Sequence, residues 1–302
     1  DEAFVPPSLT DSIAAFAIQE IDRGRLSYEF GLRYERQSVD ADGNPSRSFD
    51  GLSGSAGMVW KLAEAWTLGG SLTRAARLPS AEELYSDGPH IATLSYEIGD
   101  SDLREESSLG YTIDLRRRAG RVTGELSLFF DDYDDFIYEA PTGEVEDGLP
   151  VFLYQQSAAE FYGFEFLGVV QVMHTDRHDF DVEFRADRVR GSLVGEGGPV
   201  PRRPADTRGA GVRYRGDRCY ASAGVTITDD QTRIAGEETA TDGYTWIDAT
   251  VGYRFVADRI VHDIMVRGTN LGDEEARPHT SRLKSFVPLP GRDITVSYRL
   301  VF

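Results

Sequence analysis

Residues that could bind a metal ion gather in one stretch of the sequence, around His90. Asp87 precedes this histidine, and Glu97 and Asp100 follow it closely. Imidazole and carboxylate groups commonly hold zinc, at about 2.0–2.2 Å. The stretch is therefore a candidate metal site, although a complete site needs three or four ligands. The alternative is that His90 packs within a loop and hydrogen-bonds to a neighbouring carboxylate.

Other groups in the chain are weaker candidates for metal binding. His174, His178 and His262 lie beside short turns or at the start of a strand, where solvated side chains are expected. The acidic run at 131–135 supplies oxygen ligands of the kind that calcium prefers, but it lacks the glycine turn and closing glutamate of an EF-hand loop. A solvated strand end explains the run better.

A hydrolytic enzyme would need an activated nucleophile and a base that orients it. The available pairs are His90 with Asp87 and His279 with Ser281, and no motif for an oxyanion hole accompanies either pair. We therefore expect no enzymatic activity and no resident cofactor.

The composition sets the class of protein. The chain has 302 residues, with 32 Lys and Arg against 51 Asp and Glu, for a net charge of −19. This balance argues against nucleic acid as a partner. Mean hydropathy is −0.37, and no apolar run approaches the ~18 residues of a spanning helix. Transmembrane strands need only about 9–11 residues, with alternate ones polar. The single cysteine, Cys219, excludes a disulfide framework.

Alternating apolar and polar residues predict many strands, each with one apolar and one polar face. The last of them, for example, places Ile294, Val296 and Tyr298 on one face. We expect thirteen strands: Ser12–Ile21, Leu26–Arg36, Leu52–Leu62, Trp66–Ala76, Ser107–Arg117, Val122–Tyr138, Ala159–Met173, Asp179–Arg190, Thr207–Tyr214, Arg218–Asp229, Tyr244–Phe255, Ile260–Asn270 and Gly291–Phe302.

The predicted connections alternate between short turns and long polar loops. The long loops are Gln37–Gly51, Arg77–Glu106, Ala140–Ser157, Gly191–Asp206, Asp229–Gly243 and Leu271–Pro290. Outer-membrane barrels have this asymmetry, whereas a soluble β-sandwich has no reason for it. The predicted fold is an all-β, antiparallel transmembrane barrel meander. Single-chain bacterial barrels have an even number of strands, because both ends of the barrel lie in the periplasm. The first of these thirteen strands leads into a short turn and therefore descends from the outside, so we expect that at least one ascending strand precedes it.

Several stretches resemble the TonB-dependent outer-membrane receptors. Arg77–Tyr85 resembles the family motif R-x-P-x-x-x-E-L-Y, and Tyr96–Asp100, followed by Leu103 and Glu106, resembles the entry to the next strand, with Asp100 where the family usually has Asn. The other similar stretches, in the family's order, are Asp132–Tyr138, Glu160–Glu165, Thr269–Asp273 and the terminal Phe302.

The resemblance implies what the chain is and what it contacts. Residues 1–302 would be the C-terminal part of a 22-stranded barrel, in the outer membrane of a Gram-negative cell, without the plug domain and the earlier strands. The partners would be outer-membrane lipid, the TonB energy-coupling complex through the N-terminal part, the barrel assembly machinery through Phe302, and a metal or metal-chelate ligand.

Three stretches are most similar to the zinc-uptake receptors of that family, namely Gly88–Thr93, Gln156–Gly163 and Pro278–Ser281. They imply import of a scarce metal or metal chelate, with zinc favoured. A siderophore or haem receptor is the alternative, and a passive porin or an outer-membrane hydrolase fits less well. The predicted metal residues are His90, His279, Asp87, Glu97 and Asp100. We expect the loop Arg77–Glu106 to fold over the barrel mouth, with His279 near His90.

Overall fold

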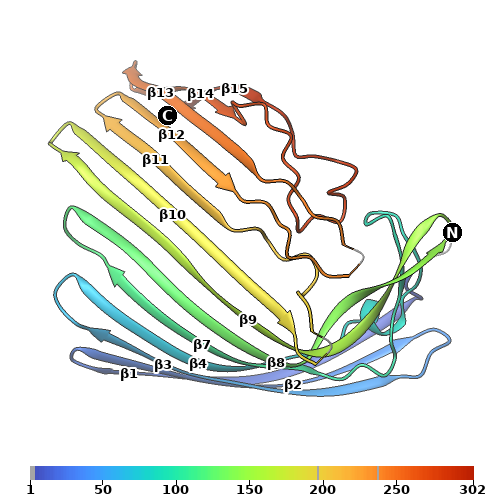
Figure 1. Cartoon of the computed structure of the whole chain (residues 1–302). Coiled ribbons are helices and arrows are strands. Elements are labelled where there is room, and N and C mark those ends of the chain that lie inside the picture. The colour runs from blue at the N-terminus through green and yellow to red at the C-terminus, as the bar shows by residue number, and fades with distance from the viewer. Residues whose placement is uncertain (1–3, 196, 237) are drawn as a thin grey trace.

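The computed structural model describes residues 4–195, 197–236 and 238–302, and almost all of its regular structure is β-strand. All thirteen predicted strands are present, as one antiparallel meander (Figure 1). In order along the sheet they are β1 (Ser8–Arg23), β2 (Leu26–Ala41), β3 (Arg47–Lys61), β4 (Trp66–Arg77), β7 (Glu106–Arg117), β8 (Val122–Glu146), β9 (Leu149–His174), β10 (His178–Leu193), β11 (Thr207–Gly216), β12 (Cys219–Thr228), β13 (Tyr244–Ala257), β14 (Ile260–Thr269) and β15 (Asp293–Val301).

Cross-strand pairing sorts the side chains into two faces. Between β2 and β3, Tyr34 pairs with Leu52, and the adjacent pair is Arg33 with Ser53. Because successive residues of a strand point to opposite sides, the first pair lies on an apolar face and the second on a polar one. The alternation read from the sequence is thus the alternation of the two faces of the sheet.

The apolar face of the sheet is uncovered. Leu32 is 58% exposed, Leu52 52% and Ile113 56%. Soluble monomers rarely expose a continuous apolar surface of this extent, so another apolar medium or partner must cover it. None of the helices in the described residues has the length and apolar character needed to cross a membrane.

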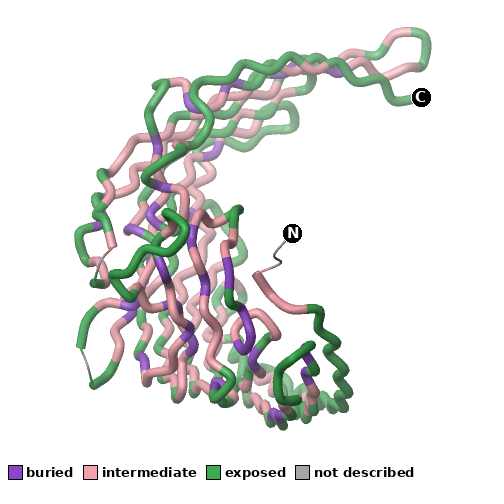
Figure 2. The backbone as a smooth tube through the Cα atoms, turned by 90° about the vertical axis from the view of Figure 1, so that its right-hand side faces the viewer, coloured by how far each residue is buried: buried purple, intermediate pink, exposed green. Residues whose placement is uncertain are grey.

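The sheet curves into an open trough whose two edges are β1 and β15 (Figures 1 and 2). Short turns join the strands at one end of the trough. Most of the long connections lie at the other end, as the sequence predicts.

Two of the predicted long loops are wrong. The region Gln37–Gly51 is mostly strand, because β2 continues to Ala41 and β3 begins at Arg47. The region Ala140–Ser157 is also strand, and β8 and β9 extend through it as a hairpin that ends in a turn at Asp147 and Gly148.

That hairpin turn has a clear physical cause. Asp147 and Gly148 both have positive φ, at 51° and 79°. Asp-Gly is a favoured pair for a two-residue hairpin turn that needs positive φ at both positions. Polar composition across Ala140–Ser157 predicts a loop, but these two residues fix a hairpin.

The connection from β4 to β7 folds back over the long-loop end of the trough. It contains helix α1 (Ala81–Tyr85) and a small hairpin of β5 (Asp87–His90) and β6 (Ser95–Ile98). β6 pairs in parallel with the extended part of β9, Tyr96 with Val151. The buried apolar cluster forms between this connection and the neighbouring strands, and consists of Val39, Ala41, Phe49, Leu84, Tyr85, Leu103, Ile137 and Tyr154.

Candidate metal centre

Helix α1 places a glutamate above the end of the trough. Ser80 and Glu83 form a reciprocal capping box that starts the helix. Leu84 and Tyr85 at its other end are buried, and the Tyr85 hydroxyl donates a 2.7 Å hydrogen bond to the Pro45 carbonyl. Because both ends of this short helix are held, the position of Glu82 in its first turn is fixed.

Gly99 allows the helix to lie against the end of β6. A Cβ at this position would be 2.6 Å from both the carbonyl carbon of Leu84 and the backbone nitrogen of Tyr85. Backbone bonds join the two elements, from Gly99 N to Ser86 O at 2.7 Å and from Asp100 N to Glu83 O at 2.9 Å. Only glycine fits this approach without displacing α1.

The β5–β6 hairpin presents two of the predicted metal residues on one face. His90 pairs with Ser95 across the hairpin, and Glu97 lies two residues further along β6 on the same side. The His90 Nδ1 atom is 3.0 Å from Oε1 of Glu97. This contact is the histidine–carboxylate hydrogen bond that the loop-packing alternative expects.

Glu82 makes this pair a cluster of three. Ligand atoms of Glu82, His90 and Glu97 lie within 4.8 Å of one another. The hydroxyl of Tyr154 bridges the two carboxylates, 3.3 Å from Oε1 of Glu82 and 3.4 Å from Oε2 of Glu97. One imidazole and two carboxylates form a donor set that suits zinc, and a fourth position would remain for water or another ligand. To bind one ion at about 2.0–2.2 Å, the three ligand atoms would have to move closer together.

The Glu97 carboxylate is completely buried but remains a good anion. Burial raises the pKa of this group. Hydrogen bonds from Ser95 (2.8 Å) and Thr93 (2.9 Å) and the nearby charge of Arg282 lower the pKa by more than burial raises it, so the pKa of Glu97 lies below its ordinary value. A buried carboxylate that keeps its charge requires such partners. The cluster therefore holds negative charge away from water, which favours a cation.

Two other predicted ligands lie away from this cluster. Asp87 is on the opposite face of the hairpin, where its carboxylate accepts a 3.1 Å hydrogen bond from the Tyr96 hydroxyl. Asp100 closes a turn, and its Oδ1 accepts from the backbone nitrogen of Asp102 at 2.8 Å. Closeness in sequence indicated both residues, but the alternation of the hairpin and the turn separate them from His90.

His279 belongs to a second buried group. Its Nε2 is 3.1 Å from Oε1 of Glu238, its Nδ1 is 3.0 Å from the Thr241 hydroxyl, and Lys284 Nζ is 3.3 Å from the ring. The side chain is only 1% exposed. Burial raises the pKa of the Glu238 carboxyl. The contacts with His279 and Lys284, together with a hydrogen bond from the Ala235 backbone nitrogen, outweigh burial and lower this pKa to about 2.

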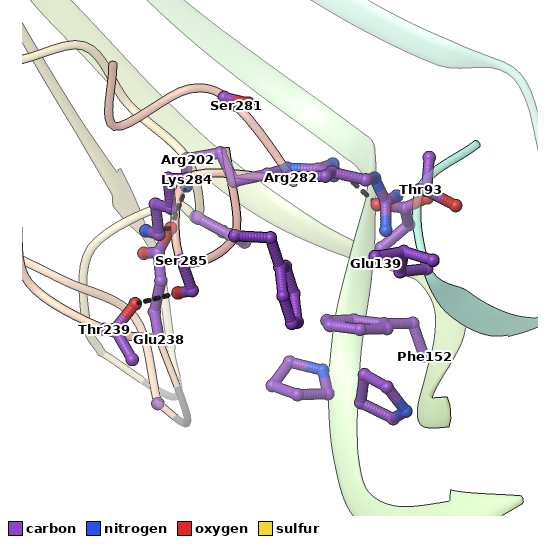
Figure 3. A pocket seen from close by; sticks show the side chains of 16 residues that line it. Thr93, Glu139, Phe152, Arg202, Glu238, Thr239, Ser281, Arg282, Lys284 and Ser285 are labelled. Carbon is purple, nitrogen blue, oxygen red and sulfur yellow. Dashed lines mark hydrogen bonds and ion pairs between the residues drawn. The ribbon is translucent and has the colours of Figure 1, made fainter. Parts of the chain in front are cut away.

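A cavity of about 220 Å³ lies between the two groups. Figure 3 shows Thr93, Glu139 and Phe152 on one side, Glu238 and Lys284 on the other, and Arg282 between them. Glu139 forms ion pairs with both Arg202 and Arg282. The connection that carries His279 thus contacts the hairpin that carries His90 through the side chain of Arg282, and not through a contact between the two histidines.

Sequence reasoning missed Glu82, Glu238 and Arg282. Glu82 lies inside the motif Arg77–Tyr85, and the spacing of Ser80 and Glu83 is a signal for a helix start that would have placed it. No local signal marks the other two, because their roles depend on contacts between distant loops.

The chain matches a protein-family model described as TonB dependent receptor-like, β-barrel, over residues 3–271. Among solved structures, the copper transporter OprC is similar with a TM-score of 0.81 and 20% identity, over 95% of this chain and 47% of that one. The FrpB iron transporter from Neisseria meningitidis (F5-1 variant) is similar with a TM-score of 0.73 and 15% identity, over 97% of this chain and 46% of that one. The ferric-catecholate import receptor Fiu from E. coli K12 is similar with a TM-score of 0.65 and 15% identity, over 96% of this chain and 44% of that one. The chain spans about half the length of these structures.

Proposed function

Because this chain belongs to the family of TonB-dependent receptor β-barrels, we propose that it is part of an outer-membrane receptor that imports a scarce metal, with zinc favoured. The uncovered apolar face of the sheet then lies against lipid, and the long-loop end faces the cell exterior. Movement of the cargo would be driven by the TonB energy-coupling complex, and Phe302 would be read by the barrel assembly machinery.

The observation that carries this proposal is the cluster of Glu82, His90 and Glu97 at the long-loop end. A metal receptor must collect a dilute cation, and this cluster offers two carboxylates and an imidazole in a largely buried place. The net charge of −19 adds a long-range attraction for cations. A nitrogen ligand favours zinc over calcium or magnesium, which prefer sites made only of oxygen atoms.

One observation favours a second candidate, a receptor for an anionic metal chelate such as a ferric siderophore or haem. The cavity has cationic side chains, Arg202, Arg282 and Lys284, beside the aromatic rings of Phe152 and Phe286. Such a lining suits an organic anion, because the cations attract its charge and the rings contact its apolar part. However, Glu139 and Glu238 already pair with these cations, so the cavity offers little free positive charge.

Zinc uptake by cells that express the full-length protein tests the proposal. His90→Ala should reduce uptake at limiting zinc while surface expression stays normal. His174→Ala is a matched control, because His174 pairs with Asp179 beside a short turn at the other end of the sheet. Unchanged uptake in the His90 variant would remove His90 from the site. Expression of the gene gives a second test, since repression by zinc supports this cargo and repression by iron supports the chelate.

A further inference from the structure

Arg282 links the connection between β14 and β15 to the β5–β6 hairpin. Its Nη1 atom is 3.7 Å from Oε1 of Glu97 and 3.4 Å from the Ser95 hydroxyl. The other side of the guanidinium forms an ion pair with Glu139, and the group lies over the ring of Phe152 at 5.4 Å. The arginine side chain is 16% exposed, so its position is constrained on several sides.

This arrangement supplies a positive charge to the buried Glu97 carboxylate. Glu97 is also in contact with His90, whose charge depends on protonation, whereas a guanidinium is always charged. In the absence of a metal ion, Arg282 is therefore a permanent cation beside Glu97. A buried carboxylate without such a partner would be strongly destabilising.

A metal ion held by Glu82, His90 and Glu97 would draw on the same carboxylate oxygens. Two cations that share one buried carboxylate repel each other, and the repulsion is strong where water is excluded. We propose that Arg282 raises the affinity that an ion needs to occupy this site, by competing with the metal ion for Glu97. This inference rests on the proposed function, because it concerns the same site.

The competition has two consequences. The competition lowers the affinity for every cation by a similar factor, so at limiting concentration only an ion that gains strongly from the imidazole and both carboxylates occupies the site. Binding is also linked to the loop, because coupling between two ligands is reciprocal. A bound metal ion weakens the hold of Arg282 on the hairpin and loosens the connection 270–292.

Zinc titration of the full-length protein in detergent tests the competition. Arg282→Gln should tighten zinc binding by about fivefold or more, the lower range of typical coupling between sites. Arg282→Lys retains the charge and should bind zinc almost as the unaltered protein does. Arg292→Gln is the matched control, because Arg292 pairs with the exposed Asp273 outside the cluster. Unchanged or weaker binding in Arg282→Gln would overturn the inference.

A second measurement keeps Arg282 in place. Val287 is 57% exposed in the same connection, so Val287→Cys in a Cys219→Ser background can carry a nitroxide label. Zinc should increase the mobility of this label, and no increase at saturating zinc would contradict the competition. If the unaltered protein binds no zinc, the proposed function fails as well. If it binds zinc and Arg282 has no effect, only this inference fails.

Discussion

The imidazole of His90 and the carboxylate of Glu97 lie 3.0 Å apart on one face of a small hairpin. The hairpin does not fold alone, since β6 pairs with β9 and its end lies against helix α1. The geometry of the pair therefore depends on three segments, and each can be perturbed separately.

Substitution of Glu97 tests the role of its charge. Glu97→Gln retains the shape of the side chain but removes the anion, so zinc affinity should fall by about tenfold or more, or about 1.4 kcal/mol. Asp87→Asn is the matched control, because Asp87 lies on the other face of the hairpin. Titration calorimetry measures the zinc affinity of each variant. Equal losses in both variants would show that only the net charge of the loop matters.

A methyl group at Gly99 tests the seating of helix α1. Its Cβ would be 2.6 Å from backbone atoms of Leu84 and Tyr85, so Gly99→Ala must displace the helix and Glu82 with it. Such overpacking costs about 1–3 kcal/mol locally, and zinc affinity should fall. Gly57→Ala is the control, because its Cβ would meet no atom closer than 3.9 Å. Similar zinc affinities in both variants would contradict the proposed position of Glu82.

The turn at Asp147 and Gly148 tests whether the extended hairpin supports the site. Gly148 has φ of 79°, which asparagine tolerates and valine does not. Gly148→Val should therefore loosen the end of β9 and, through its pairing with β6, increase hydrogen exchange at Tyr96 and Glu97. Gly148→Asn should leave exchange nearly unchanged. Equal protection in both variants would show that β6 is held without β9.

Acid should loosen the β14–β15 connection through Glu238. Its pKa in the folded protein is about 2, below the ordinary value of 4.5. The charged form therefore contributes stability that is complete above about pH 4.5 and is lost as the pH falls towards 2. Proteolysis by pepsin should cleave 270–292 faster across this window. In Glu238→Gln the cleavage rate should not rise in this way as the pH falls. The same rise in both proteins would assign the effect to other groups.

Much of the fold was predictable from the sequence because period-two alternation is a local signal. Tyr28, Phe30 and Leu32 mark one face of a strand wherever that strand lies. Strand ends were less predictable, because β2 and β8 continue beyond the apolar alternation through polar residues that pair with their neighbours. The turn at Asp147 and Gly148 carried a usable signal that composition obscured.

The candidate site was only partly predictable. His90 and Glu97 were found because they are close in sequence and of the right type. Glu82 needed the helix to be recognised, and Arg282 needed a contact across 187 residues. Asp87 and Asp100 show the opposite case, since residues near in sequence were separated by strand alternation and by a turn. His279 stays a prediction as a ligand, although its contacts are to Glu238, Thr241 and Lys284.

Anomalous diffraction at the zinc edge, from crystals of the full-length protein soaked with zinc, tests the central claim most directly. We expect a peak bounded by Glu82, His90 and Glu97, at about 2.0–2.2 Å from one atom of each. Crystals of Glu97→Gln should show this peak weakened or absent. A zinc peak elsewhere, with these three side chains unmoved and unoccupied at saturating zinc, would contradict the claim that this cluster is the metal centre.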